Sequence, residues 1–302
     1  MHLKMLLSMI AAASFAAAPA LAQEPTGTLK KIKDTGTITL GHRESSVPFS
    51  YYDDKQQVVG YAMDLCGRIV ERLKSELKLA KLDVKLNPVT SATRIPLMAN
   101  GTIDLECGST TNSLERQKQV SFTITHFVTA NRFVSKKAAN LQTVDSLKGK
   151  TITSTSGTTN IKQITEIGAQ KNLGLNILPA KDHAEAFLMV ETDRAAAFVM
   201  DDILLYSLVA SAKTPGDYVI SKDALSVEPY GIMVRRDDPA FKKVVDAEMT
   251  RIYKSGEINA IYDKWFTKPI PPKGINLNLP MTDQFKKVVA NPTSSGDPKD
   301  YQ

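Results

Sequence analysis

One short stretch of the sequence gathers groups that suit the binding of a carboxylate. An apolar strand is predicted at residues 103–105, and three consecutive hydroxyl side chains follow it at residues 109–111. A short helix is then expected to begin near Asn112 or Ser113, both good N-cap residues, and to present Arg116 in its first turn. Helix-start N–H groups favour an anion, and a guanidinium grips a carboxylate with two parallel hydrogen bonds. Because no nucleophile and base accompany these groups, the stretch indicates a site that holds a ligand without reacting with it.

Further polar residues follow other predicted strands. They are Arg43, Ser91, Arg94, the glycine-containing turn at residues 155–159 that ends in Thr159, His183 and Asp201, and they add to Ser109 and Thr111 of the first stretch. The turn at residues 155–159 is expected to open a helix, and such a turn is a candidate anion-binding site. Each residue alone has an ordinary explanation as a helix cap, a surface arginine or a polar helix residue. We nevertheless expect them to act together, because the carboxyl ends of parallel strands share one edge of a sheet.

Strands and helices alternate along the chain. Strands are expected at residues 37–40, 83–86, 103–105, 151–154, 176–178 and 196–200, and helices at 61–77, 91–100, 159–171, 182–191 and 202–211. This order predicts an α/β fold whose parallel sheets are covered by helices on both faces.

The N-terminus has the pattern of a secretory signal peptide. His2 and Lys4 precede an apolar run at residues 5–18, and an Ala-x-Ala site ends at Ala22. The apolar run is too short for a membrane span, which needs roughly 20 residues. The alternative is a buried N-terminal helix. We expect residues 1–22 to be removed on export, with cleavage after Ala22.

Composition is that of a well-packed globular protein. Of 302 residues, 42% are hydrophobic and 23% are charged, and the formal net charge is +6. The mature chain has roughly 280 residues, more than a single hydrophobic core usually accommodates, so two domains are predicted. The basic residues are scattered, without the stripe typical of a nucleic-acid binder, so no nucleic-acid partner is expected. The four histidines and two cysteines share no ligand spacing, so neither a metal nor a cofactor is expected.

The two cysteines are candidates for a disulfide. Cys66 is expected on the helix that begins near Tyr61, and Cys107 at the end of the strand at residues 103–105. A helix packed on that strand brings them together, and an exported chain permits the bond. Closing a loop of about 40 residues contributes roughly 4 kcal/mol on the chain-entropy model. The alternative is two buried free thiols, because sequence does not fix the geometry.

The longer motifs of the chain resemble a known family. They are Gly-His-Arg-Glu-Ser-Ser-Val-Pro-Phe-Ser-Tyr-Tyr (41–52), Asn-Gly-Thr-Ile-Asp-Leu-Glu-Cys-Gly-Ser-Thr-Thr-Asn (100–112), Thr-Ser-Gly-Thr-Thr (155–159), Ala-Lys-Asp-His (180–183), Met-Asp-Asp (200–202) and Lys-Trp-Phe-x-x-Pro-Ile-Pro-Pro-Lys (264–273). Together they look like the periplasmic glutamate/aspartate-binding proteins of bacterial ABC importers, in solute-binding protein family 3. The resemblance covers nearly the whole mature chain. Cys66 departs from the family pattern, which bears on the disulfide and not on the ligand.

The resemblance implies a two-lobed, type II periplasmic binding protein with two strands crossing between the lobes. Lobe 1 would comprise residues 23–127 and 231–302, and lobe 2 residues 128–230. The crossings would lie near residues 127–134 and 228–234. The tail after Pro269 would wrap lobe 1, and its last ten residues are expected to be disordered.

The resemblance also implies a role for each candidate residue. The α-carboxylate would contact Arg116, Thr111 and Thr159, the α-ammonium would contact Asp201 and Ser109, and the side-chain carboxylate would contact Arg43, Ser91, Arg94 and His183. We expect L-glutamate and L-aspartate as ligands, a surplus of guanidinium charge around them, and a protonated His183. We also expect the protein to be a periplasmic monomer that works with an ABC permease of the inner membrane.

Two other classes of function remain open. One is a periplasmic enzyme on the same fold, such as a dehydratase, for which Glu44 or Glu166 would have to supply the acid or base. The other is a binding protein for a different polar amino acid. Neither acid has a partner in the sequence, so the binding protein for acidic amino acids is the preferred interpretation.

Overall fold

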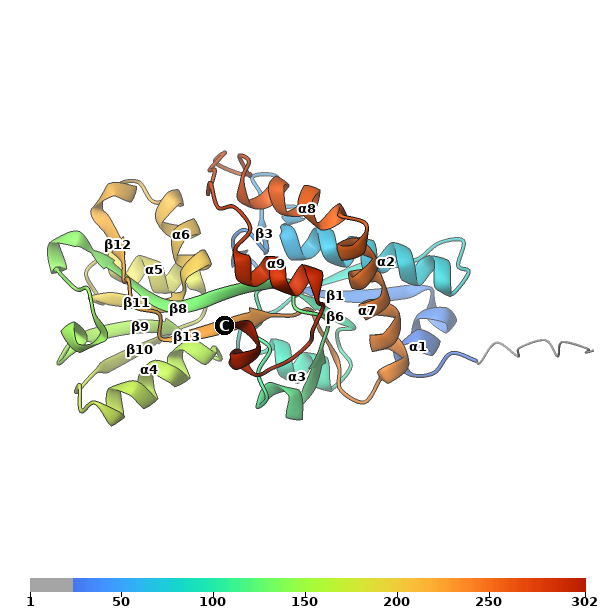
Figure 1. Ribbon diagram of the computed structural model, residues 1–302, viewed down its shortest axis with the longest axis horizontal. Coiled ribbons are helices and arrows are strands. Elements are labelled where there is room, and N and C mark those ends of the chain that lie inside the picture. The colour runs from blue at the N-terminus through green and yellow to red at the C-terminus, as the bar shows by residue number, and fades with distance from the viewer. Residues whose placement is uncertain (1–23) are drawn as a thin grey trace, which may run out of the picture.

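The computed structural model describes residues 24–302 and divides them into two lobes (Figure 1). Two strands run between the lobes, β8 (Phe127–Lys136) and β13 (Ser226–Tyr230). They pair antiparallel, with Phe127 opposite Tyr230 and Asn131 opposite Ser226. The predicted signal peptide and its cleavage site after Ala22 lie outside the described residues. No helix in the described part of the chain has the length and apolar character to cross a membrane.

Lobe 1 is built on a mixed five-stranded sheet. Its order is β5 (Asp83–Pro88), β1 (Thr37–His42), β6 (Leu105–Cys107), β14 (Met233–Arg235) and β7 (Val120–Phe122). The pairs of β1 with β5 and with β6 are parallel, as predicted, whereas β14 pairs antiparallel with β6 and β7. A small antiparallel sheet lies beside it, formed by β2 (Ser45–Ser46), β3 (Ser50–Tyr52) and β4 (Val58–Val59). The expectation of purely parallel sheets is therefore wrong, because the chain returns from lobe 2 in the opposite direction.

Helices cover both faces of the lobe 1 sheet (Figure 1). They are α1 (Gly27–Thr35), α2 (Tyr61–Glu76), α3 (Arg94–Ala99), α7 (Pro239–Lys254), α8 (Glu257–Phe266) and α9 (Asp283–Ala290), with the 3₁₀ helices η1 (Arg116–Lys118) and η5 (Pro298–Tyr301). The short helix α3 covers one face through an apolar cluster that includes Met98, Phe122 and Met233. On the opposite face, α2 packs against α7 and α8. Burial of these apolar faces holds the lobe together.

Lobe 2 repeats the strand–helix pattern. Its sheet has the order β10 (Asn176–Ala180), β9 (Thr151–Thr155), β11 (Ala197–Asp201), β8 and β12 (Tyr218–Ile220), with β13 also on β8. The helices are α4 (Thr159–Gln170), α5 (His183–Glu191) and α6 (Asp202–Ser211), with the 3₁₀ helices η2 (Lys137–Ala139), η3 (Val144–Leu147) and η4 (Pro215–Asp217). Alternate residues of β11 point to opposite faces. Ala197 and Val199 therefore join the cluster under α4, and Phe198 and Met200 join the cluster under α5 and α6.

The disulfide between Cys66 and Cys107 is confirmed. The sulfur–sulfur distance is 2.07 Å and the Cα atoms are 6.2 Å apart. Cys66 lies on the buried face of α2, and Cys107 ends β6 beneath it. The bond therefore ties the helix directly to the strand after which the predicted carboxylate-binding stretch begins.

An aromatic cluster anchors the crossing strands to lobe 1. The ring of Phe49 lies 5.1 Å from that of Phe127, at the start of β8, and 5.2 Å from that of Tyr230, at the end of β13. Phe266 at the end of α8 stacks on Phe127 at 4.9 Å. Aromatic pairs at these spacings add to the free energy gained from burial. The lobe 1 ends of both crossings are thereby held in one apolar core.

Three local expectations need correction. The helix predicted from residue 91 begins at Arg94, and turns occupy residues 91–93. No α-helix begins at Asn112, because the backbone N–H of Asn112 donates to Pro229 O at 2.7 Å and the following residues form turns before η1. The last ten residues are ordered, since η5 ends at Tyr301, which is only 3% exposed. Contacts with segments far away in the sequence decide all three outcomes.

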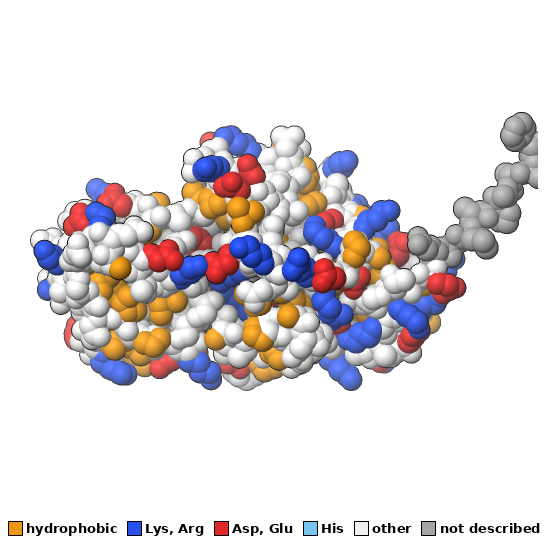
Figure 2. Space-filling view, turned by 90° about the horizontal axis from the view of Figure 1, so that it is seen from below, with side chains coloured by type: hydrophobic (Ala, Val, Ile, Leu, Met, Phe, Trp, Pro, Cys, Tyr) orange, Lys and Arg blue, Asp and Glu red, His pale blue; other side chains and the backbone are white. Residues whose placement is uncertain are grey.

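Charged side chains are dispersed over the surface. Figure 2 shows one face of the molecule, on which basic and acidic side chains are interspersed across both lobes. Several are paired, as Lys136 is with Asp193 at 2.7 Å. Exposed pairs of this kind contribute little to stability. The charges that bear on ligand binding are those buried between the lobes.

Candidate functional site

A narrow cavity lies between the two lobes. The residues that line it are Ser91, Arg94, Ser109, Thr111, Thr158, Thr159, Asn160, His183, Met200, Asp201 and Leu204. Seven of the nine predicted site residues are among them. The other two, Arg43 and Arg116, adjoin the cavity through contacts with His183 and Thr111. The structure thus brings together residues that are spread over more than half of the chain.

The elements of the two sheets explain this convergence. On the lobe 1 side, Arg43 follows β1, Arg94 opens α3 after β5, and Ser109 and Thr111 follow β6. On the lobe 2 side, Thr159 begins α4 after β9, His183 begins α5 after β10, and Asp201 ends β11. These three strands are parallel in the second sheet. The carboxyl ends of both sets of strands therefore face one another across the cavity, where ligands of open α/β sheets bind.

The three arginines are buried. Arg43 and Arg94 are each 2% exposed and Arg116 is 7% exposed. Burial, followed by the charge of Arg94, lowers the pKa of Arg43 and of Arg116 to about 10. Burial also lowers the pKa of Arg94. At these values Arg43 and Arg116 remain positively charged at neutral pH.

Arg116 connects the two lobes. Its Nη1 atom donates to Thr111 O at 2.9 Å, and its Nη2 atom donates to Gly157 O at 3.2 Å in the turn before α4. Gly157 has a φ of +76°, and a Cβ atom there would lie 2.5 Å from the Cα of Ala92 in lobe 1. Only glycine fits this close approach. The 155–159 turn is therefore held directly against the lobe 1 wall of the cavity.

Arg94 is part of a buried chain that includes an acid. Its Nη1 atom donates to Thr110 Oγ1 at 2.5 Å, and the Thr110 hydroxyl donates to Glu106 Oε2 at 2.6 Å. Glu106 is fully buried. Thr110 and Glu106 were not among the predicted residues, although a glutamate between Leu105 and Cys107 is a recognisable signal.

A second acid missed by the sequence analysis lies at the crossing. Glu228, on β13, accepts hydrogen bonds from Thr159 Oγ1 at 2.9 Å and from Gln163 Nε2 at 2.7 Å. With Glu106 and Asp201, it makes three buried carboxyl groups beside the three arginines. The expected surplus of guanidinium charge is therefore not a property of the whole site. Hydrogen-bond donors and acceptors are instead distributed unevenly around the cavity.

His183 does not have the environment expected of a charged imidazole. Its Nδ1 atom lies 2.8 Å from Thr155 Oγ1. Burial, then Arg43 and Arg94, lowers the pKa of His183 well below its usual range. The structure therefore does not support a protonated His183, because two guanidiniums beside it already carry positive charge.

Asp201 is the acceptor on the lobe 2 side of the cavity. Its Oδ1 atom accepts from Asn160 Nδ2 at 2.7 Å, and its Oδ2 atom accepts from the Tyr230 hydroxyl. Burial, then the charge of Glu228, raises the pKa of Asp201 to about 7. A cation beside this carboxyl group would favour its ionised form. Asn160 and Tyr230 were missed because neither is near Asp201 in the sequence.

Four buried polar atoms of the nine predicted site residues have no hydrogen-bond partner within residues 24–302, and neither has Glu106 Oε1 beside them. The four atoms are Arg43 Nη1, Arg94 Nε, Ser91 Oγ and Ser109 Oγ. An unpaired buried polar atom costs about 1–3 kcal/mol, and more when it carries charge. Two of these atoms belong to guanidiniums and two to hydroxyls, so all four can donate to an oxygen anion. In chemical terms, these donors match a carboxylate and Asp201 matches a cation.

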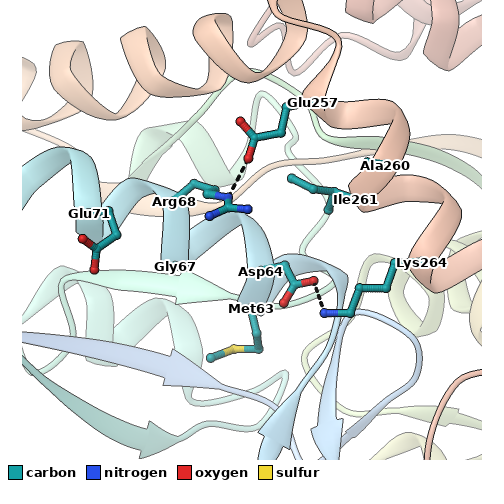
Figure 3. A pocket seen from close by; sticks show the side chains of 9 residues that line it. All are labelled: Met63, Asp64, Gly67, Arg68, Glu71, Glu257, Ala260, Ile261 and Lys264. Carbon is teal, nitrogen blue, oxygen red and sulfur yellow. Dashed lines mark hydrogen bonds and ion pairs between the residues drawn. The ribbon is translucent and has the colours of Figure 1, made fainter.

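A hollow on the outer surface of lobe 1 offers different chemistry. It lies between α2 and α8, and Figure 3 shows two ion pairs across it. Arg68 pairs with Glu257 at 2.6 Å, and Lys264 pairs with Asp64 at 2.7 Å. None of the predicted site residues lines this hollow. No group of three or more His, Cys, Asp or Glu side chains in residues 24–302 is placed to ligate a metal.

Comparison with known proteins agrees with this geometry. Residues 38–268 match the model of the bacterial extracellular solute-binding proteins, family 3. A protein of Pseudomonas aeruginosa named L-glutamate/L-aspartate-binding protein is 55% identical over 95% of this chain and 96% of its own length. A protein of Escherichia coli named glutamate/aspartate import solute-binding protein is 45% identical over 95% of both chains.

Solved structures share the fold. A mutant arginine-binding protein from T. maritima aligns with a TM-score of 0.71 and 27% identity, over 79% of this chain and 99% of that one. An ancestral amino-acid-binding protein, described as a precursor of cyclohexadienyl dehydratase, aligns with a TM-score of 0.67 and 27% identity, over 80% of this chain and all of that one. The chain is therefore a member of family 3 of the bacterial extracellular solute-binding proteins, with the two-lobed fold of that family.

Proposed function

We propose that the protein binds L-glutamate and L-aspartate between its lobes and delivers them, in the periplasm, to the permease of an ABC importer. Membership of the solute-binding family supports the general role. The names of the relatives from P. aeruginosa and E. coli support the class of ligand. The chemistry of the cavity gives an independent reason for an acidic amino acid.

The single observation that carries this proposal is the position of the unpaired donors relative to Asp201. Arg43 Nη1 and Arg94 Nε have no partner within the described chain, and both side chains are almost fully buried. Such donors favour a ligand carboxylate, while Asp201 favours an ammonium. In the proposal, a second carboxylate binds Arg116, whose guanidinium lies between the lobes. Two carboxylates and one ammonium are the charged groups of an acidic amino acid.

In this proposal each group of the ligand contacts its own set of side chains. The α-carboxylate binds Arg116, Thr111 and Thr159, whose two threonine hydroxyls lie 3.5 Å apart across the lobes. The α-ammonium binds Asp201 and Ser109. The side-chain carboxylate lies among Arg43, Ser91, Arg94 and His183 and accepts from the donors of the first three.

Binding between lobes also provides a signal that a permease can read. Contacts divided between two lobes stabilise the closed arrangement, and the two crossing strands are the natural hinge. We assign lobe 1 to residues 23–127 and 231–302 and lobe 2 to residues 128–230, so that both boundaries fall at the lobe 1 ends of β8 and β13. We further propose that the protein acts as a monomer.

The two acids named for the enzyme alternative are not at the cavity. Glu44 and Glu166 are both exposed, and neither lines the cavity. The relatives are named as binding proteins rather than enzymes. The chain is thus a binding protein, and the structural similarity to a dehydratase precursor reflects a shared fold.

Isothermal titration calorimetry tests the proposed ligand class. We expect L-glutamate and L-aspartate to bind with micromolar or tighter affinity, about −8 kcal/mol or more favourable. L-Glutamine should bind at least about tenfold more weakly, because its amide cannot neutralise Arg43 and Arg94. L-Arginine is the control, since solved neighbours are described as arginine-bound. Equal binding of glutamine or arginine, or no binding of either acid, would overturn the proposal.

A further inference from the structure

The chain continues beyond the region that matches the family model. That match ends at residue 268. The C-terminal tail, defined here as residues 269–302, follows α8, forms α9 and ends in η5. In Figure 1 the C-terminus lies beside β13, close to where the crossing strands leave lobe 1. Residues outside the family match therefore reach the neighbourhood of the site.

The end of the tail is bonded to the two ends of one site loop. We define the Arg116 loop as residues 112–117. The Nδ2 atom of Asn112 donates to the backbone oxygens of Ser294 at 2.9 Å and Ser295 at 3.0 Å. The Nε2 atom of Gln117 donates to Ser294 O at 3.1 Å and to Asn112 Oδ1 at 2.8 Å. The tail thereby closes a bridge between the first and last residues of the loop.

Gly296 presses on the middle of the same loop. A Cβ atom at Gly296 would lie 2.8 Å from Leu114 N and 2.8 Å from Ser113 C, closer than real Cβ contacts allow. Its backbone conformation is not in the left-handed region, so the space, and not the φ angle, calls for glycine. The tail and the loop are therefore in direct backbone contact.

The tail itself is firmly attached at this end. Tyr301 is 3% exposed, and its hydroxyl donates to Ser295 O at 2.7 Å and lies 2.8 Å from Thr125 Oγ1. The backbone N–H of Thr125 donates to Thr293 O at 2.8 Å. Thr125 lies two residues before the crossing strand β8 begins. The contacts fix the tail to lobe 1 at the base of the hinge.

The Arg116 loop has little regular structure of its own. It consists of irregular and turn residues and the first two residues of η1. Within it, the Arg116 N–H donates to Ser113 Oγ at 3.3 Å and the Gln117 N–H donates to Ser113 O at 2.9 Å. Yet this loop sets the position from which Arg116 reaches Thr111 O and, in lobe 2, Gly157 O. A loop with few internal hydrogen bonds needs external support to hold a side chain in one place.

From these contacts we propose that residues 293–301 are a positioning segment for Arg116 and so raise the affinity for the ligand carboxylate. This inference rests on the proposed function for its affinity readout. The segment touches none of the nine predicted ligand-binding side chains through the hydrogen bonds above. It acts by holding the loop, so that Arg116 need not be ordered when the ligand binds.

The test compares Gly296→Ala with Gly216→Ala. The first places a Cβ against the loop backbone, and the second places one where nothing lies within 4 Å. We expect Gly296→Ala to weaken L-glutamate binding about tenfold in calorimetry and Gly216→Ala to change it less than about twofold. Hydrogen exchange of the amides at residues 112–117 should be faster in Gly296→Ala alone. An unchanged dissociation constant in Gly296→Ala would overturn the inference.

A second pair of variants separates positioning from general loss of stability. Tyr301→Phe and Tyr51→Phe each remove a hydroxyl that donates to a tail carbonyl at 2.7 Å, Ser295 O and Pro271 O respectively. Both should lower the melting temperature, but only Tyr301→Phe should weaken L-glutamate binding and speed exchange in the loop. Equal effects of the two on binding would contradict a positioning role. If the unmodified protein binds no acidic amino acid, the proposed function fails, and exchange at residues 112–117 still decides whether the segment holds the loop.

Discussion

The Nη2 atom of Arg43 in lobe 1 lies 3.5 Å from the Nε2 atom of His183 in lobe 2. A guanidinium has no acceptor, so Nε2 must present its lone pair to Arg43. The proton of the neutral ring then resides on Nδ1, which faces the Thr155 hydroxyl at 2.8 Å. This arrangement agrees with the lowered pKa of His183, which burial and the two neighbouring arginines cause. His183 is therefore a neutral link between the lobes.

The pH dependence of binding should consequently follow Asp201 and not His183. Burial and Glu228 raise the pKa of Asp201 to about 7, so the carboxyl group is increasingly protonated below that pH. A ligand ammonium binds the ionised form, and binding must then release a proton. We expect the affinity for L-glutamate to fall as the pH drops below about 7, by up to about tenfold per pH unit. Calorimetry at pH 5.5, 6.5 and 7.5 measures this slope.

The control for this prediction is Asp201→Asn, which cannot ionise. Its affinity should be weaker at pH 7.5 and nearly independent of pH. Affinity that instead decreases as the pH rises from 5.5 to 7.5 would assign the titration to a protonated His183. That outcome would contradict the neutral ring inferred from the contact with Arg43.

Arg94→Ala should reduce the affinity for L-glutamate more than any outer-surface arginine does. The side chain is 2% exposed, and its Nε atom has no partner within the described chain. Removing one member of a buried charge pair costs about 2–5 kcal/mol. The matched control is Arg68→Ala on the outer hollow, whose guanidinium pairs with Glu257 and is largely exposed. Calorimetry should give a change below about 0.5 kcal/mol for Arg68→Ala, and a change that small for Arg94→Ala would remove it from the ligand site.

The order of elements was predictable because strands and helices carry local signals. The bounds of α5 and α6 agree with the expectation to within a residue, since Asp182 is an N-cap and the apolar strand before Asp202 ends at Asp201. The resemblance grouped all nine candidate residues, and the structure places them around one cavity.

The electrostatic partners were not predictable in the same way. Glu228 and Thr159 are 69 residues apart, and Asn160 and Asp201 are 41 residues apart. Such contacts follow from how two sheets face each other, which no local pattern specifies. The tail was misjudged for a related reason. Its composition suggests disorder, but Tyr301 finds an apolar site at the hinge that only the folded lobe provides.

Replacing both cysteines by alanine should destabilise lobe 1. The bond closes a separation of 41 residues, and the chain-entropy model gives a contribution of about 4 kcal/mol for a loop of this size. Urea denaturation of the Cys66→Ala/Cys107→Ala protein should show a free energy of unfolding lower by roughly that amount. Adding reductant should shift the unmodified protein in the same direction and leave the double variant unchanged. A double variant as stable as the parent would mean that packing of α2 on β6 alone fixes the strand.

His126→Phe should stabilise the protein, because His126 is buried in an apolar setting that suits a phenyl ring. The side chain is fully buried among the rings of Phe49, Tyr61 and Tyr230, and neither ring nitrogen has a hydrogen-bond partner within residues 24–302. Its backbone groups are bonded independently of the ring. Replacing the imidazole with a phenyl ring therefore removes unpaired polar atoms and adds only one ring atom. We expect the free energy of unfolding at pH 7.5 to rise by about 1–2 kcal/mol.

The same substitution should reduce the loss of stability in acid. Burial lowers the pKa of His126 to about 3. The unfolded chain therefore binds a proton near pH 6.5 that the folded chain does not accept, and stability falls as the pH drops from about 6.5 towards 3, by at most about 1.4 kcal/mol per pH unit. Phenylalanine does not titrate, so the stability gain of His126→Phe should be larger at pH 5 than at pH 7.5. His42→Phe is the contrasting variant, because Nδ1 of His42 donates to Arg43 O at 3.2 Å and its loss should bring no gain at pH 7.5. A gain for His126→Phe that is the same at both pH values would mean that the ring is protonated in the folded protein as readily as in the unfolded chain.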